Sequence, residues 1–237
     1  MSRSRSLLEK EIIRAAASCF GQQGYRAATL ETIAARAGIS KVTLYNYVSG
    51  KEELLCRVFE RTMESYRTGL RQIIDRRLPA DDALRRIIRY QVMFLTSDLP
   101  FLRVFFSEES GLPPHMAKRV AQEKRECDRA IEKVVREGIR EGLFRNLPPT
   151  LFVFALLGMC NWLYKWYCPE GKLAPDEIGA IFVDLLERGY VRRGGDKPGD
   201  LLLRSLRRVE RRIVALDSRL ARPPRRAGTR RGPRYRA

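Results

Sequence analysis

One short stretch of the sequence carries side chains that could contact nucleic acid. At helical spacing, Lys41, Val42 and Tyr45 become neighbours on one face, while Leu44 and Val48 form an apolar i, i+4 pair on the opposite face. A cation, a branched apolar group and an aromatic hydroxyl can all contact base edges, and the major groove of DNA admits a helix. The pattern therefore predicts a helix whose rear packs on the protein and whose front contacts base pairs.

A preceding helix must hold this one in place. Thr29 is a favourable N-cap, and Thr32 follows three residues later in place of the Glu or Gln of a full capping box. The next apolar residues recur every three or four positions and so share an inward face: Leu30, Ile33, Ala34 and Ala37. Gly38 suits the tight turn that follows, because glycine tolerates a left-handed backbone, and Ser40 caps the second helix.

The stretch FGQQGYRAATLETIAARAGISKVTLYNYVSGKEELL resembles the N-terminal domain of TetR-type transcriptional regulators, from about Leu7 to Leu55. The residues that carry the resemblance are Phe20, Gly24, Tyr25, Thr29, Ile33, Ala34, Gly38, Ser40, Thr43, Leu44, Tyr45, Tyr47, Lys51, Glu53 and Leu54. Val42 is a departure, since many members carry Gly or Pro there; its side chain could touch a thymine methyl or hold the helix further from the bases. The alternative is a small three-helix unit that binds nothing.

The expected partner of this segment is a double-stranded DNA operator. The candidate DNA-binding residues are Thr29, Ser40, Lys41, Val42, Thr43, Tyr45, Tyr47 and Lys51. Among them, Lys41, Val42 and Tyr45 are expected to face the bases. The candidates for contacts to phosphates, which fix register without reading sequence, are Thr29, Thr43, Tyr47 and Lys51.

The composition offers little material for enzyme chemistry. His115 is the only histidine, and the five cysteines lie far apart without a CxxC pair. Neither a Ser-His-Asp triad nor a zinc or disulfide framework is predicted, and unpaired cysteines are typical of a reducing compartment. We therefore expect no catalytic residues, no metal and no cofactor.

No membrane segment or signal peptide is predicted. The basic residues 1–5 are followed by Leu-Leu-Glu-Lys-Glu instead of an apolar run. The longest apolar stretch, residues 151–164, is too short to span a bilayer and contains Asn161. The expectation is a cytoplasmic protein without a membrane partner.

The rest of the chain reads as helices. Its 237 residues with 44% apolar content allow one to two domains, and no alternating strand pattern occurs, so the fold class is all-α. The expected domains are a helix–turn–helix domain at 1–55 and a helical effector-binding and dimerisation domain at 56–191. Besides the two helices above, helices are expected at 6–22, 51–77, 80–96, 100–107, 114–142, 150–167 and 176–190.

The last two of these helices are expected to form a homodimer. The segment LFVFALLGMCNWLYKWY is too apolar for a monomer's surface, and Ala155 and Gly158 are small enough to admit a neighbouring helix. Residues 176–190 supply a second apolar face, so that two chains would form a four-helix interface, as TetR-type regulators do. The alternative, an intramolecular core helix, does not exclude the dimer. A dimer would also present two recognition helices to two half-sites of a palindrome.

Aromatic residues are dense in the second domain and predict a ligand cavity. They are Phe94, Phe101, Phe105, Phe106, Phe144, Phe152, Phe154, Trp162, Tyr164, Trp166 and Tyr167. Because cations lie among them, the expected effector is a small amphiphilic anion, and the candidate contacts are Arg103, Phe105, Trp162, Lys165 and Trp166. The stretches NWLYKWYCPEGKLAPDEI and FLRVFFSEESGLPP resemble TetR-type regulators that respond to acyl-CoA thioesters. The alternative is that these aromatics are simply part of the core, which holds for most of them.

The C-terminal residues carry most of the net positive charge. Residues 192–237 hold 16 of the 46 basic but only 4 of the 28 acidic residues, so this segment carries +12 of the net charge of +18. Within 192–222, apolar residues recur at heptad spacing and predict a short parallel coiled coil, for which the alternatives are a helix folded onto its own protomer or no structure. Residues 223–237 read as a disordered basic tail that adds affinity for phosphates.

These features together favour a ligand-responsive, dimeric DNA-binding repressor. Two other readings remain open: a lipid- or thioester-binding protein with a vestigial helix–turn–helix, and a nonspecific nucleic-acid-binding protein driven by the basic tail.

Overall fold

The computed structural model describes residues 3–190, and over this range the chain is helical without strands, which confirms the all-α prediction. In chain order the helices are α1 (Arg3–Gln23), α2 (Leu30–Arg36), α3 (Lys41–Tyr45), α4 (Lys51–Ile74), α5 (Ala80–Ser97), α6 (Leu99–Ser107), the short 3₁₀ turn η1 (Glu109–Gly111), α7 (Pro114–Arg140), α8 (Pro149–Asn161), α9 (Leu163–Trp166) and α10 (Pro175–Tyr190). The predicted coiled coil at 192–222 and the basic tail at 223–237 lie outside the described residues.

The predicted capping and turn residues form the helix–turn–helix. Thr29 and Thr32 make a reciprocal capping box, in which each backbone N–H donates to the other's hydroxyl oxygen at 3.2 Å. A threonine therefore completes the box that usually needs Glu or Gln. Gly38 has a φ of +70°, and Ser40 Oγ accepts a hydrogen bond from Thr43 N at 3.0 Å. These contacts set the start of α2, the turn and the start of α3.

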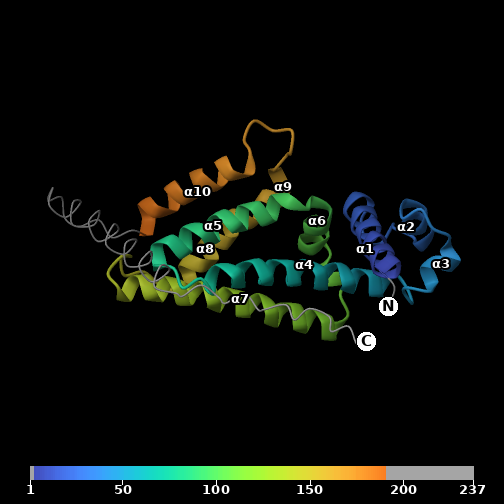
Figure 1. The fold of residues 1–237 in the computed structure, drawn as a ribbon, viewed down its shortest axis with the longest axis horizontal. Coiled ribbons are helices and arrows are strands. Elements are labelled where there is room, and N and C mark those ends of the chain that lie inside the picture. Colours follow the sequence, from blue (N-terminus) through green and yellow to red (C-terminus); the bar gives the residue numbers. More distant parts are fainter. Residues whose placement is uncertain (1–2, 191–237) are drawn as a thin grey trace, which may run out of the picture. The chain divides into compact units, whose positions relative to one another are not determined.

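Helices α1, α4 and α6 connect the helix–turn–helix to the helical body (Figure 1). Phe20, Ile33 and Leu44 are buried between α1, α2 and α3. On its other side α1 packs closely against α6: a Cβ placed on Gly21 would lie 3.2 Å from the carbonyl oxygen of Pro100. Because protein interiors are densely packed, a displacement of α6 is expected to displace α1 as well.

The helical body is built around α5, which packs against α4, α7, α8 and α10 (Figure 1). Leu84, Ile87 and Ile88 of α5 are fully buried, which follows from their three- and four-residue spacing. Helix α7 ends at Arg140 and is followed by Gly142, whose φ of +69° lets the chain reverse. The interior of the helical body is therefore surrounded by helices from its whole length in sequence.

The structure corrects the expected single helix at 150–167. Helix α8 ends at Asn161 and the short α9 begins at Leu163, with Trp162 between them. At this break the Asn161 side chain accepts a hydrogen bond from Gln91 Nε2 of α5 at 3.0 Å. Helical periodicity does not predict this contact, because the contact joins two helices that are far apart in the sequence.

The aromatic residues do not enclose one space, as the sequence suggested. Phe144 and Phe152 instead pack against Tyr190, with ring centroids 4.7 and 5.4 Å away. Trp162 and Trp166 are 61% and 50% exposed. The aromatics that border a cavity of the helical body include Phe94, Phe105, Phe106 and Phe154.

Candidate DNA-binding surface and ligand cavity

Helix α3 presents the three side chains expected to face bases. Val42 is 75% exposed, Tyr45 is 50% exposed, and the Lys41 side chain is about half exposed at 48%. On the rear of the same helix and turn, Leu44 and Val48 are buried. The exposed surfaces of Val42 and Tyr45 are not covered by other residues of the described chain, so they are available to a partner.

Lys41 is held by a carboxylate of the preceding helix. Its ammonium donates to Glu31 of α2, and this contact raises the pKa of Lys41 and lowers the pKa of Glu31. Both side chains are largely exposed, so the pair is easily exchanged for another anion. The Lys41 ammonium also lies 5.9 Å from the centre of the Tyr45 ring.

The remaining candidate DNA contacts have different roles within the fold. The Thr29 and Ser40 hydroxyls cap α2 and α3, and the Thr43 hydroxyl lies 2.8 Å from that of Ser40. Lys51 donates to the carbonyl oxygens of Arg26 and Ala28 at 3.1 and 3.0 Å. With two of its three N–H groups engaged, the Lys51 ammonium holds the loop before α2 and retains one donor.

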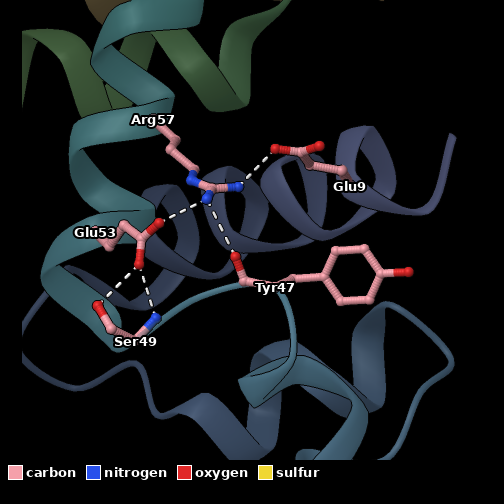
Figure 2. Close-up of polar contacts among 5 residues, drawn as sticks. All are labelled: Glu9, Tyr47, Ser49, Glu53 and Arg57. Carbon is pink, nitrogen blue, oxygen red and sulfur yellow. Dashed lines mark hydrogen bonds and ion pairs between the residues drawn. The ribbon is translucent and has the colours of Figure 1, made fainter. Parts of the chain in front are cut away.

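An ion-pair network fixes the end of the helix–turn–helix, as Figure 2 shows. Arg57 of α4 donates to Glu9 of α1 at 2.7 Å, to Glu53 at 2.6 Å and to the carbonyl oxygen of Tyr47 at 3.1 Å. Glu53 in turn accepts from the backbone N–H and hydroxyl of Ser49 at 2.7 and 2.8 Å. The Tyr47 ring points away from this network. The loop after α3 is thereby tied to both α1 and α4.

The helical body contains a cavity of about 360 Å³, within the range of small-molecule sites. Helices α4 to α8 contribute its lining, which is Thr62, Met63, Tyr66, Gln91, Phe94, Leu95, Phe105, Phe106, Lys124, Asp128, Phe154, Leu157, Gly158 and Asn161. The lining is mainly apolar, with a cation, a carboxyl group and two amides. Such a cavity fits a ligand with an apolar body and a few polar groups.

Of the five predicted ligand contacts, only Phe105 lines this cavity. The four that are exposed and not part of the lining are Arg103, Trp162, Lys165 and Trp166. The cation at the cavity is Lys124 of α7 instead. A signal for it exists in the sequence, because Lys124 follows the buried Val120 by four residues and precedes the buried Cys127 by three, which places it on the inward stripe of α7.

The charged groups at the cavity are paired or desolvated. The Lys124 ammonium binds Glu109 of η1 at 2.7 Å and lies 4.8 Å from the centre of the Phe105 ring. Burial raises the pKa of the neighbouring Asp128 carboxyl, although the positive charge of Lys124 opposes the shift. Lys124 therefore connects the cavity lining to the turn that follows α6.

A second cavity of about 240 Å³ shares Thr62 and Phe94 with the first. It contains Arg61, whose Nη1 is buried and has no hydrogen-bond partner, and whose guanidinium lies 4.4 Å from the centre of the Phe101 ring. Burial raises the pKa of Asp98 at this cavity, against the influence of Arg61. An unpaired guanidinium N–H beside this cavity offers a donor to a carbonyl or an anion.

Two other kinds of site are absent from residues 3–190. No group of three or more His, Cys, Asp or Glu side chains in this range could hold a metal ion. No helix in the described range has the length and apolar character needed to cross a membrane.

Two family models match the chain. Residues 12–58 match the model of the bacterial regulatory proteins of the tetR family, and residues 77–190 match that of the tetracyclin repressor-like C-terminal domain. The first range contains the helix–turn–helix, and the second contains most of the cavity lining.

Characterised relatives are transcriptional regulators. The chain is 23% identical over 186 residues to the transcriptional repressor KstR2 of Mycobacterium tuberculosis, covering 78% of this chain and 93% of the relative. It is 30% identical over 121 residues to the transcriptional activator FasR of Mycolicibacterium smegmatis, covering 51% and 55%. Its fold matches AibR in complex with isovaleryl coenzyme A and operator DNA, with a TM-score of 0.69 and 23% identity over 75% of this chain and 97% of AibR.

Proposed function

The chain belongs to the TetR family of transcriptional regulators, and we propose that it binds a palindromic operator as a homodimer and is released by an amphiphilic effector. The observation that carries the DNA half of this proposal is the exposed face of Lys41, Val42 and Tyr45 on a helix fixed by its caps and by Arg57. A rigid helix with solvated, chemically varied side chains is suited to the major groove. We propose repression as the sign of regulation, as in KstR2.

The DNA proposal is tested by operator selection followed by substitution. Tyr45→Ala and Lys41→Ala are expected to weaken operator binding by about 1–3 kcal/mol each, and to weaken nonspecific binding less. Lys133→Ala, which removes an exposed cation from α7, is the matched control. If Tyr45→Ala binds the operator as tightly as the wild type, α3 does not read the groove.

Selection of a palindrome also separates this proposal from its two rivals. A thioester- or lipid-binding protein with a vestigial helix–turn–helix would protect no DNA. A nonspecific binder driven by the basic C-terminal residues would bind DNA without preference and with a steep salt dependence.

Support for the homodimer comes from exposed apolar residues on α8, α9 and α10. They are Leu151, Phe154, Trp162, Trp166, Ile181 and Leu185, each at least 44% exposed in the single chain. Large apolar side chains left exposed in the single chain are available to an association surface. Leu185→Glu is expected to shift the protein to monomer in sedimentation, while Leu7→Glu on α1 leaves the dimer intact.

The effector that suits the cavity best is an acyl-CoA thioester with a bulky apolar acyl group. The apolar lining of the first cavity would hold the acyl group, and the unpaired Nη1 of Arg61 in the adjoining cavity would meet the thioester carbonyl or the polar group beyond it. AibR provides support from a related fold, because its structure was determined with isovaleryl coenzyme A. Arg103, Trp162, Lys165 and Trp166 are not required for this arrangement.

Lys124 provides a route from the cavity to the DNA-binding helices. Its partner Glu109 directly follows Glu108, which accepts a hydrogen bond from the backbone N–H of Tyr25 at 3.1 Å. A ligand that draws Lys124 away from Glu109 would move η1 and thereby the loop between α1 and α2. The ligand shifts the equilibrium only by its different affinity for the two arrangements.

The effector proposal is tested by titrating thioesters into the protein–operator complex. A CoA thioester with a branched or ring-containing acyl group is expected to release DNA and raise the melting temperature, whereas free CoA does neither. Lys124→Met should blunt the release while leaving operator binding intact without ligand. The proposed effector class is wrong if no thioester stabilises the protein or releases DNA.

A further inference from the structure

Gln91 carries a buried acceptor that the protein leaves without a partner. The residue lies on α5, is 4% exposed and lines the larger cavity. Its Nε2 donates to Asn161 Oδ1 at 3.0 Å, but its Oε1 is buried and accepts no hydrogen bond. Because buried polar groups in folded proteins are almost always paired, this oxygen needs a partner that enters the cavity.

Thr62, a neutral polar residue of the same lining, is by contrast already satisfied. The Thr62 hydroxyl donates to the carbonyl oxygen of Val58 at 2.8 Å, one turn earlier on α4. Thr62 therefore needs nothing from a ligand, whereas Gln91 does. The Asn161 contact also restricts the Gln91 amide, so that its remaining atom has a defined position.

We propose that Gln91 is a specificity residue that selects an effector with a hydroxyl group on its acyl portion. The hydroxyl would donate to Gln91 Oε1, while the apolar lining holds the rest of the acyl group. A hydroxyl group can donate, as this acceptor requires, and it carries no charge into the apolar lining. This inference rests on the proposed thioester response and names the chemical class of the acyl group.

Gln91 is therefore expected to discriminate against effectors whose acyl group carries no hydroxyl. A saturated acyl group would leave Gln91 Oε1 buried and unpaired, as it is in the free protein, whereas a hydroxyl would pair it. Sites built to bond a hydroxyl reject the analogue that lacks it. The expected preference for a correctly placed hydroxyl is about tenfold to hundredfold in Kd.

Calorimetric titration of the full chain tests this with matched probes. The probes are octanoyl-CoA, 3-hydroxyoctanoyl-CoA and 8-hydroxyoctanoyl-CoA, which place the hydroxyl near either end of the acyl group. We expect one hydroxylated thioester to bind the wild type at least tenfold more tightly than octanoyl-CoA. Gln91→Met, which keeps the length of the side chain but removes its amide, should abolish this preference. Thr62→Val, which removes a hydroxyl that is already bonded, should retain it.

The outcomes separate this inference from the thioester proposal. If the wild type binds octanoyl-CoA as tightly as both hydroxylated thioesters, or if the preference survives in Gln91→Met, the role of Gln91 is overturned while the thioester response stands. If no thioester binds, the thioester proposal fails, and the free acids octanoic and 3-hydroxyoctanoic acid are titrated instead. A preference for the hydroxy acid that Gln91→Met removes would still support the assignment, and its absence would overturn it. If Gln91→Met does not fold, the comparison of octanoyl-CoA with the two hydroxylated thioesters on the wild type still tests the expected preference.

Discussion

The carboxylate of Glu108, at the end of α6, accepts a hydrogen bond from the backbone N–H of Tyr25 at 3.1 Å. The two residues are 83 positions apart in the chain, and Tyr25 lies in the loop that precedes α2. The Tyr25 ring in turn lies 4.6 Å from the ammonium of Lys51, which holds the carbonyl oxygens of the same loop. This contact joins the end of α6 to the segment that positions the helix–turn–helix.

Glu108→Ala is expected to weaken the communication between effector and operator. Removal of the carboxylate leaves the Tyr25 N–H without its partner and should destabilise the protein by about 1–2 kcal/mol. The ratio of operator affinities without and with effector should fall, as measured by fluorescence anisotropy. Glu141→Ala, which removes an exposed carboxylate at the end of α7, is the control. An unchanged ratio in Glu108→Ala would show that α6 signals by another contact.

Arg57→Met should weaken operator binding without touching any DNA-facing side chain. The substitution frees the carbonyl oxygen of Tyr47 and separates α4 from α1 at Glu9. Ordering one loop residue on binding costs about 1–2 kcal/mol, so roughly a tenfold loss of operator affinity is expected. Arg136→Met, which breaks the exposed pair with Glu132 on α7, should bind the operator like the wild type. Equal affinities for the two variants would contradict the role assigned to Arg57.

The helix–turn–helix could be predicted from the sequence because its signals are local. Thr29, Gly38 and Ser40 act on backbone groups within a few residues, and the structure shows each one in the expected cap or turn. The Lys41–Glu31 pair was not predicted, because it joins two helices whose relative rotation the turn determines.

The sequence indicated that the second domain contains a cavity, but it did not identify most of the residues that line it. Aromatic density indicated an apolar space, but it could not separate Phe105, which lines the cavity, from Trp162 and Trp166, which are exposed. The polar residues of the lining were missed altogether. Gln91 and Asn161 meet across 70 positions of sequence, and no periodicity reports such a pair.

Asp128 is expected to make stability fall as the pH rises. Burial raises its pKa in the folded protein above the value of 3.8 for an exposed carboxyl, so the folded state holds this proton more tightly than the unfolded chain. The stabilising contribution is complete below pH 3.8 and is lost as the pH rises through the folded-state pKa. Asp128→Asn should therefore gain stability relative to the wild type as the pH rises through that value, measured by urea unfolding.

The control for Asp128→Asn is Asp184→Asn, which removes a carboxylate from an exposed pair with Arg188. If the free energies of unfolding of wild type and Asp128→Asn run parallel from acid to neutral pH, the Asp128 carboxyl is not desolvated in solution.

Truncation after Tyr190 should separate nonspecific from specific DNA binding. It removes residues 191–237, which carry a net charge of +12, and the salt dependence of binding grows with the number of phosphates that a protein neutralises. The truncated protein is expected to bind nonspecific DNA more weakly and with a shallower salt slope, while it keeps the dimer and the operator preference. Nonspecific affinity equal to that of the full chain would assign the basic residues another purpose.

Glu31→Gln is expected to strengthen DNA binding, because Glu31 holds the ammonium of Lys41 in the free protein. Lys41 must exchange this carboxylate for a base or a phosphate, and Glu31 itself repels the phosphate backbone. Since the pair is exposed, the expected gain is modest, about two- to fivefold in Kd at low salt, and it should shrink as salt is added.

A double-mutant cycle distinguishes release of Lys41 from a general change of charge. In the Lys41→Ala background the Glu31→Gln substitution should give a smaller gain, because only the repulsion between Glu31 and the phosphates is then removed and there is no ammonium left to release. An equal gain in both backgrounds would mean that Glu31 acts only through its own repulsion of DNA. In that case Lys41 would not be a base-facing residue that Glu31 restrains in the free protein. Val42 and Tyr45 would remain as the side chains of α3 that contact the bases.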